Sequence, residues 1–231
     1  MQIIEFYGLP GSGKSTVCER VIKELRSSGN QVGDIDEYLK YCKGIKWVMR
    51  GLVSRNGFTF FSTALGTLRR KKLLFCRDVI VRVLRVLQFY AYYDMCVKQK
   101  RYTYMLMDQA IIQGYISTFY DYTDMTADDY RCVVKGIFPY NFMSFYMEIS
   151  PETASERIDM RGEEDHGRCD KIKDIASRIR ILEIQAKNFD CGHSVFSKTH
   201  SSYRVDANLD IDEKVRFVLE KVDKGFKREL Q

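Results

Sequence analysis

The residues from Gly8 to Ser15 constrain the fold of this chain more than any other feature. They read Gly-Leu-Pro-Gly-Ser-Gly-Lys-Ser, the pattern of a loop that wraps around phosphate groups. The apolar run from Gln2 to Tyr7 precedes the loop, as a buried first strand would, and apolar residues recur at helical spacing from Thr16 to Leu25. Strand, loop and helix in this order favour an α/β fold over a glycine-rich turn that matches by accident.

The chemistry of the loop predicts that it binds a nucleoside triphosphate. Gly8 and Gly13 allow consecutive N–H groups to turn toward an anion, and the start of the following helix adds unpaired N–H groups and a positive dipole end. Lys14 would contact the outer phosphates, and the Ser15 hydroxyl would ligate Mg²⁺. The predicted nucleotide-binding residues of the loop are Gly8, Pro10, Gly11, Ser12, Gly13, Lys14, Ser15 and Thr16.

Length and composition are those of a soluble globular protein. The 231 residues suffice for one α/β domain, with 45% hydrophobic and 29% charged residues. No apolar run approaches the roughly 20 residues of a membrane span, and the first residues already belong to the predicted strand, so we expect no signal peptide. The seven cysteines lack the paired spacing of a zinc site, which favours reduced thiols and a cytoplasmic location.

Positive charge is concentrated in one part of the chain. From Tyr41 to Arg101, 14 Lys and Arg stand against only Asp78 and Asp94, which gives +12, whereas the remainder carries 23 Lys and Arg against 29 Asp and Glu, or −6. This basic segment could receive phosphate-bearing substrates, or it could bind nucleic acid or an anionic membrane surface. We favour the first of these hypotheses, because several cations are needed for such substrates.

Apolar runs predict four further strands, at Val32–Ile35, Tyr102–Met107, Phe142–Ile149 and Ser202–Val205. A long helical stretch is expected from about Tyr38 to Lys100, interrupted near 54–57 and 69–72. The other predicted helices are about 111–120, 127–136, one capped by Ser150, 171–189 and 211–226. Strands that alternate with helices imply a five-stranded parallel sheet flanked by helices. No repeat or linker divides the chain, so we predict one domain over residues 1–231.

The order of these parts resembles the P-loop nucleoside and nucleotide kinases, and most closely the thymidylate kinase family. Besides the loop, three stretches carry the resemblance: Asp108-Gln109 followed by Gln113, Tyr115 and Ser117; Ser150-Pro151-Glu152-Thr153-Ala154 with Arg157, Arg161 and Arg168; and Arg204-Val205-Asp206-Ala207-Asn208 with Asp212, Glu213 and Val215. Gln109 stands where the thymidylate kinases have an arginine that grips the acceptor's phosphate.

The resemblance implies a strand order of 2-3-1-4-5 and phosphoryl transfer from ATP, with Mg²⁺, to a small acceptor. It also implies an acceptor-side helical segment at about 38–101, an arginine-bearing lid at about 157–170, and nucleotide contacts from Asp206 and Ala207. The resembled kinases are often dimers, and the apolar helix around Val79 to Tyr93 could supply the interface of a homodimer.

Several residues are candidates for the chemistry. Asp108, at the end of the third strand, could hold Mg²⁺ through water, or it could cap the next helix. Asp36 is our preferred base for an acceptor hydroxyl, with Glu37 the alternative, and either could instead be a solvated acid or a cap. The loop offers no cation besides Lys14, so the transition-state arginines are expected from the lid; these catalytic candidates are Arg157, Arg161 and Arg168, which could otherwise be surface charge.

The leading hypothesis is a kinase that phosphorylates a nucleoside, a nucleoside monophosphate or another hydroxyl metabolite. The alternative is an NTPase whose hydrolysis serves a protein, nucleic-acid or membrane partner. A GTPase is disfavoured because no Asn-Lys-x-Asp motif is present. The aromatic residues Trp47, Phe58, Phe60 and Phe61 could line an acceptor pocket, although packing in the core is the better interpretation.

Overall fold

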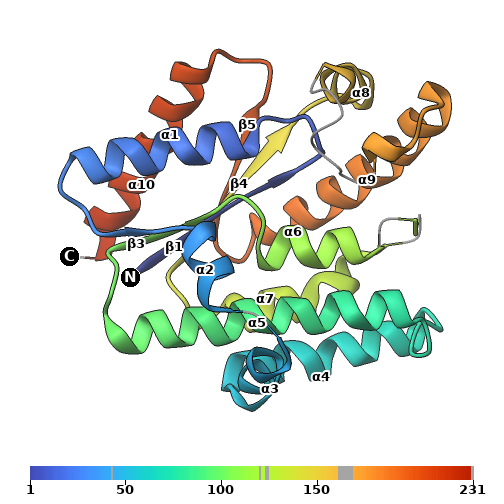
Figure 1. Ribbon diagram of the computed structural model, residues 1–231, viewed down its shortest axis with the longest axis horizontal. Helices are drawn as coiled ribbons and strands as arrows, with labels where there is room; N and C mark the ends of the chain where they lie inside the picture. Colours follow the sequence, from blue (N-terminus) through green and yellow to red (C-terminus); the bar gives the residue numbers. More distant parts are fainter. Residues whose placement is uncertain (43, 120, 123–124, 161–168, 230–231) are drawn as a thin grey trace.

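A five-stranded sheet, all parallel, organises the computed structural model, which describes residues 1–42, 44–119, 121–122, 125–160 and 169–229. The strands lie in the order β2-β3-β1-β4-β5 (Figure 1), so the predicted fold class and strand order are confirmed. Their bounds are β1 Gln2–Gly8, β2 Val32–Gly33, β3 Tyr104–Met107, β4 Phe142–Glu148 and β5 Ser201–Asp206.

The register of the sheet brings the predicted site residues to one edge. Glu5 of β1 pairs with Met107 of β3, and Gly8 of β1 pairs with Met147 of β4. The phosphate loop and Asp108 therefore leave neighbouring strands at the same edge. In open parallel sheets, ligands bind at the carboxyl ends of the strands.

Alternating residues of β1 serve two cores. Ile4 and Phe6 pack in a cluster with α1 (Lys14–Ser27) and α10 (Ile211–Glu229), whereas Ile3 and Tyr7 face the larger cluster on the other side of the sheet. Figure 1 shows α1 and α10 on the first face and α5, α6 and α7 on the opposite side. Because strand side chains alternate between faces, this one strand anchors both helical layers.

The segment predicted to lie on the acceptor side folds into four helices: α2 Ile35–Tyr41, α3 Ile45–Val53, α4 Arg55–Arg70 and α5 Arg77–Gln99. The second strand ends earlier than predicted, because Asp34 caps α2 by accepting the backbone N–H of Glu37 at 3.1 Å. The helices break at Ser54 and over 71–76, which overlaps the predicted interruptions near 54–57 and 69–72, although residues 55–57 and 69–70 are helical. The break before α3 was not predicted; Gly44 lies there at φ 86°.

One side of α5 lies inside the protein's own core. Val83, Leu87, Tyr90 and Tyr93 of this helix are at most 1% exposed. This buried side of the helix packs against α3, α4 and α6, whereas Val81 on the same helix is 39% exposed, so a subunit interface around Val79 to Tyr93 stays a prediction.

The remaining helices are α6 Ile111–Ile116, α7 Arg131–Ile137, α8 Pro151–Asp159 and α9 Ile175–Phe196, with short 3₁₀ turns between them. Ser150 caps α8 as predicted, accepting the N–H of Thr153 at 3.2 Å. Helix α9 continues past the predicted end at Phe189 because Phe196 still packs in the core. None of the described helices combines the length and apolar character that crossing a membrane requires.

Candidate active site

The phosphate loop threads between β4 and α8 at two glycines. Gly8 has φ 143°, and a Cβ there would lie 2.5 Å from the carbonyl oxygen of Met147. Gly11 has φ 83°, and a Cβ there would lie 2.8 Å from the carbonyl oxygen of Ala154. Both positions need a backbone conformation and a close approach that only glycine permits. The loop conformation is thus set by backbone contacts from two neighbouring elements.

Lys14 holds its ammonium group within the loop. Its Nζ donates to the carbonyl oxygens of Gly8 at 3.0 Å and Leu9 at 2.7 Å, and to the Ser12 hydroxyl at 3.2 Å. Helix α1 begins at Lys14, and within the described part of the chain no side chain caps its start. A buried cation and uncapped helix N–H groups together form a cradle for negative charge.

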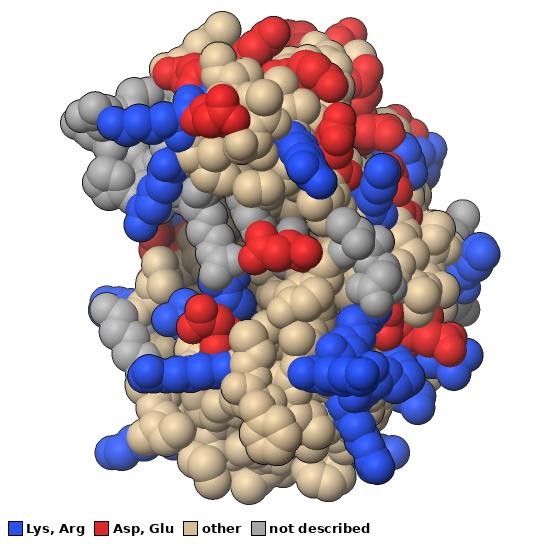
Figure 2. All heavy atoms as spheres, turned by 90° about the vertical axis from the view of Figure 1, so that its right-hand side faces the viewer, with Lys and Arg blue, Asp and Glu red and all other residues tan. Residues whose placement is uncertain are grey.

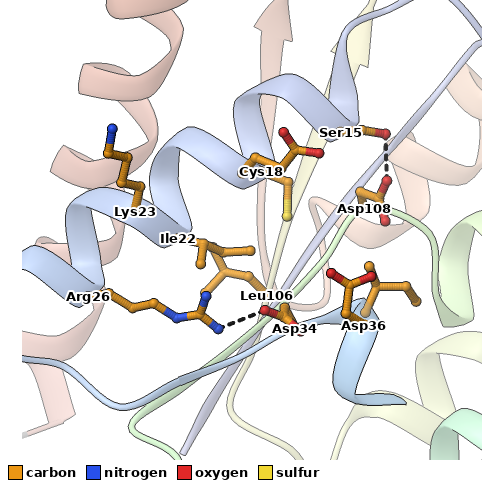
Figure 3. A pocket seen from close by; sticks show the side chains of 11 residues that line it. Ser15, Cys18, Ile22, Lys23, Arg26, Asp34, Asp36, Leu106 and Asp108 are labelled. Atoms are coloured by element: carbon orange, nitrogen blue, oxygen red, sulfur yellow. Dashed lines mark hydrogen bonds and ion pairs between the residues drawn. The ribbon is translucent and has the colours of Figure 1, made fainter. Parts of the chain in front are cut away.

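Ser15 and Asp108 converge across the edge of the sheet. The Ser15 hydroxyl donates to Oδ2 of Asp108 at 2.6 Å (Figure 3). Asp108 accepts no hydrogen bond from the start of α6, so its side chain is directed to the phosphate loop rather than used as a helix cap.

Glu5 caps α6 instead, from the middle of β1. Its carboxylate is fully buried and accepts the backbone N–H groups of Ala110 at 3.1 Å, Ile112 at 3.1 Å and Gln113 at 2.8 Å. Burial raises the pKa of Glu5 to about 7, although the backbone hydrogen bonds lower it in part. Sequence reasoning missed this residue; the available signal was one acid inside an otherwise apolar strand.

Gln113 connects α6 to the phosphate loop. Its Oε1 accepts the backbone N–H of Gly8 at 2.9 Å, and its Nε2 donates to the Ser117 hydroxyl at 3.1 Å. Tyr115, which the resemblance grouped with these two residues, lies in the core, where its hydroxyl donates to the carbonyl oxygen of Asp129 at 2.6 Å. Gln113 and Ser117 therefore face the site and Tyr115 does not.

A cavity of about 380 Å³ lies beside the phosphate loop and is drawn in Figure 3. Asp36 lines it together with Ser15 and Asp108, and no hydrogen bond or ion pair joins Asp36 to another residue in the described ranges. Glu37 is engaged elsewhere, since it accepts from the Tyr102 hydroxyl and lies 3.8 Å from Arg101. Of the two candidate bases, only Asp36 lies at this cavity.

A second cavity, of about 830 Å³, opens on the other side of Asp108. Tyr38 and Phe89 stack in its wall with ring centroids 4.4 Å apart. Asp108 and Ile35 line both cavities, so the two spaces meet there. The other residues around the second cavity are Leu39, Arg82, Arg85, Val86, Gln109, Ala110, Gln113, Gly114 and Ser117.

The aromatic residues considered from sequence lie elsewhere. Phe60 is fully buried in the core, Phe58 is 61% exposed, and Trp47 lines a separate hollow beside α5. None of them, nor Phe61, lines the larger cavity. Sequence reasoning did not find Tyr38, Phe89, Arg82 and Arg85, because these side chains come from different helices and share no motif.

The loop after β5 meets α8 through Arg157. Its guanidinium donates to the carbonyl oxygen of Ala207 at 3.2 Å and to Oδ1 of Asn208 at 3.1 Å. Asp206 accepts the backbone N–H of Asn208 at 2.8 Å. Helix α8 thus touches both this loop and, at Ala154, the phosphate loop. Arg161 and Arg168, with most of the predicted lid, lie outside the described residues.

Comparison with known proteins identifies structures that share this fold. No family model and no curated protein matches this chain. It is similar to a solved structure of deoxyadenosine kinase from M. mycoides with the products dCMP and a flexible dCDP, with 17% identity, a TM-score of 0.54, and coverage of 96% of this chain and 100% of that one. The chain has the fold of a P-loop nucleoside kinase.

A second structure of the same kinase, with bound dCTP, gives 18% identity and a TM-score of 0.51, again over 96% of this chain and all of the other. At this identity the likeness extends to the fold alone. The closer resemblance to thymidylate kinases stays a prediction, since these two structures are of a deoxyadenosine kinase.

Proposed function

We propose that this protein is a phosphotransferase that moves the γ-phosphate of ATP to a hydroxyl of a small acceptor, in the first place a nucleoside or nucleoside monophosphate. One observation carries the proposal: Asp108 lines both cavities and is bonded to Ser15 of the phosphate loop. A triphosphate held in the loop would then face a separate acceptor cavity across one carboxylate. The kinase fold, and the nucleotides bound to the M. mycoides enzyme, support a nucleoside-type acceptor.

In this proposal the chain acts mainly by positioning and by charge. Phosphoryl transfer passes through a loose transition state with charge spread over the peripheral oxygens. Lys14 and the loop N–H groups would orient the β- and γ-phosphates and offset their charge. Asp36 would accept the proton of the acceptor hydroxyl at its carboxylate, since it lines the loop cavity next to Ile35, where the two cavities meet, and has no other partner among the described residues.

The Ser15 and Asp108 oxygens suit Mg²⁺. They converge to 2.6 Å, and Mg²⁺ is typically held by one or two protein oxygens together with phosphates and water. When bound, the ion supplies neutralisation of phosphate charge. Asp108→Asn should keep the shape of the site but raise the Mg²⁺ concentration needed for activity, and an unchanged Mg²⁺ titration would remove Asp108 from this role.

The nucleotide and lid roles extend the proposal. Asp206 and Ala207 would border the base of ATP, with Arg157 fixing their loop. Arg157, Arg161 and Arg168 would supply positive charge to the transferred group. Replacing Arg161 by Ala should lower kcat and kcat/KM together, as expected for an interaction made in the transition state. We also propose a cytoplasmic enzyme, and a homodimer would need a surface other than the buried face of α5.

Transfer of label from γ-labelled ATP tests the proposed function. The purified protein is offered nucleosides, nucleoside monophosphates, sugars and amino sugars, with acceptor-free hydrolysis measured in parallel. Labelled product from one acceptor class, lost in Asp36→Asn while ATP binding persists, is the expected result. If ATP is hydrolysed but no tested acceptor becomes labelled, the result would contradict the proposed kinase activity and favour an NTPase.

A further inference from the structure

The helices α3 and α4 and the turn that follows them contain no acidic residue; the first one, the exposed Asp78, comes in the first turn of α5. From Gly44 to Arg77 the chain has eight Lys and Arg and no Asp or Glu. Figure 2 shows that on the face it presents, Asp and Glu gather in the upper part, and that the lower part, at the height of α3 and α4 in Figure 1, combines Lys and Arg with uncharged surface. This part of the molecule attracts anions.

The same helices expose apolar side chains. Ile45, Met49 and Val53 follow one another at four-residue intervals on α3 and are 69%, 51% and 81% exposed. Phe58 is 61% exposed, and Phe75, in the turn between α4 and α5, is 98% exposed. Single exposed apolar residues are common, but an exposed helical stripe together with a fully exposed Phe indicates a surface that contacts something apolar.

Two ion pairs hold the start of the turn that carries Phe75. Arg70 and Lys71 pair with the buried carboxylate of Asp129, at 3.0 and 3.2 Å. By contrast, the exposed side chains of Arg69, Lys72 and Arg77 form no ion pair within the ranges that the structure describes. Their charges flank Phe75 and are available to a partner.

We propose that this basic–apolar surface, formed by the exposed residues of 45–77, docks on a lipid bilayer that contains anionic headgroups. Lys and Arg beside exposed aromatic and aliphatic residues are the composition of interfacial membrane contacts, in which cations meet headgroups and apolar side chains enter the acyl boundary. The surface lies outside both cavities, so docking leaves the proposed kinase site open.

Two other occupants fit less well. A symmetric contact between two copies would press the same basic–apolar surface against itself, which like charges oppose. A nucleic acid would suit the cations and could stack on Phe58 and Phe75. The α3 stripe of Ile45, Met49 and Val53, however, offers no π-face and no hydrogen bond to a base.

Vesicle flotation tests the proposal with the full chain. Vesicles of phosphatidylcholine, with and without phosphatidylserine, are compared over a range of salt concentrations. Binding should require phosphatidylserine and weaken with salt. Neutralising Arg69, Lys72 and Arg77 together to Gln should lower partitioning about 100-fold, because each cation near an anionic surface contributes roughly a fivefold factor.

Phe75→Ser should lower partitioning on its own. The matched controls are Phe138→Ser, at a site 77% exposed, and the triple replacement of Lys187, Lys198 and Arg216 by Gln; both should bind vesicles as the parent does. Circular dichroism confirms that each variant is folded.

Absence of phosphatidylserine-dependent binding, or equal loss in the control triple, would overturn the proposal. So would binding to single-stranded RNA in place of vesicles, or a concentration-dependent mass that Phe75→Ser abolishes. Because none of these variants alters the phosphate loop, transfer activity in solution reports on the proposed function separately.

Discussion

The two sides of Asp108 are built by different means. On the proposed nucleotide side, one continuous segment supplies the phosphate loop, and backbone contacts at Gly8 and Gly11 hold its conformation. On the proposed acceptor side, the cavity of about 830 Å³ is assembled from residues of α2, α5 and α6 and the turn after β3. A site made by one backbone segment has little freedom to vary, whereas a site assembled from several helices can change acceptor by exchanging side chains.

The nucleotide side should show the largest single effect. Lys14→Ala removes the cation from the loop and should lower kcat by about 10²–10³, by analogy with the loss of one oxyanion contact. Steady-state transfer assays measure this loss, and Lys187→Ala, which removes an exposed lysine of α9, serves as the control. Turnover near that of the parent would show that the phosphate loop is not the reaction site, and would contradict its assignment as the nucleotide side.

Glu5, which joins the two sides, should make stability depend on pH. Its pKa is raised from 4.5 to about 7 in the folded state. Between pH 4.5 and 7 the folded state therefore binds more protons than the unfolded state, and the stability that protonated Glu5 contributes is lost as the pH rises through this range. The shift corresponds to about 3 kcal/mol in the free energy of unfolding. Denaturant unfolding of Glu5→Gln and the parent should show their difference changing by that amount between pH 4.5 and 7.

His200 provides the opposite slope as an internal reference. Burial against β4 lowers its pKa from 6.5 to about 4, so its neutral form contributes stability that is present above pH 6.5 and lost as pH falls toward 4. His200→Gln should therefore differ from the parent mainly at acid pH. If both variants follow the parent's pH profile, neither buried group titrates as its surroundings imply.

The same contrast explains what the sequence could predict. The fold and the phosphate loop follow from short-range patterns: an apolar strand, glycines at set spacing, and a helix start. Ser150 as a cap is equally local. Glu5 capping α6 is not predictable in this way, since the contacts join residues more than 100 positions apart. The Tyr38–Phe89 wall likewise depends on how two helices pack, which no local pattern specifies.

A moderate effect is expected on the acceptor side. Arg85 lines the acceptor cavity and is exposed to it, so Arg85→Ala should raise KM for an anionic acceptor about 10-fold while KM for ATP stays unchanged. Arg180→Ala, an exposed arginine that lines neither cavity, is the matched control. A rise in KM for ATP alone would place Arg85 on the nucleotide side. It would contradict the assignment of the two cavities to different ligands.

The smallest effect should come from Gln113, which, like Asp108, lines the acceptor cavity and also hydrogen-bonds to the phosphate loop. Gln113→Ala leaves the N–H of Gly8 without its acceptor, at a cost of about 1 kcal/mol, or roughly a fivefold fall in kcat/KM. Gln113→Glu keeps an oxygen for this N–H and should recover most of the loss.

A double-mutant cycle of Gln113→Ala with Arg85→Ala, measured on the kinetics of both the acceptor and ATP, tests whether the two sides are coupled. Coupling between Gln113 and Arg85 above about 0.5 kcal/mol would show that the loop and the acceptor cavity act as one unit. Strict additivity would show that the two sides bind their ligands independently although they meet at Asp108. In that case a change on one side would not reach the other through α6.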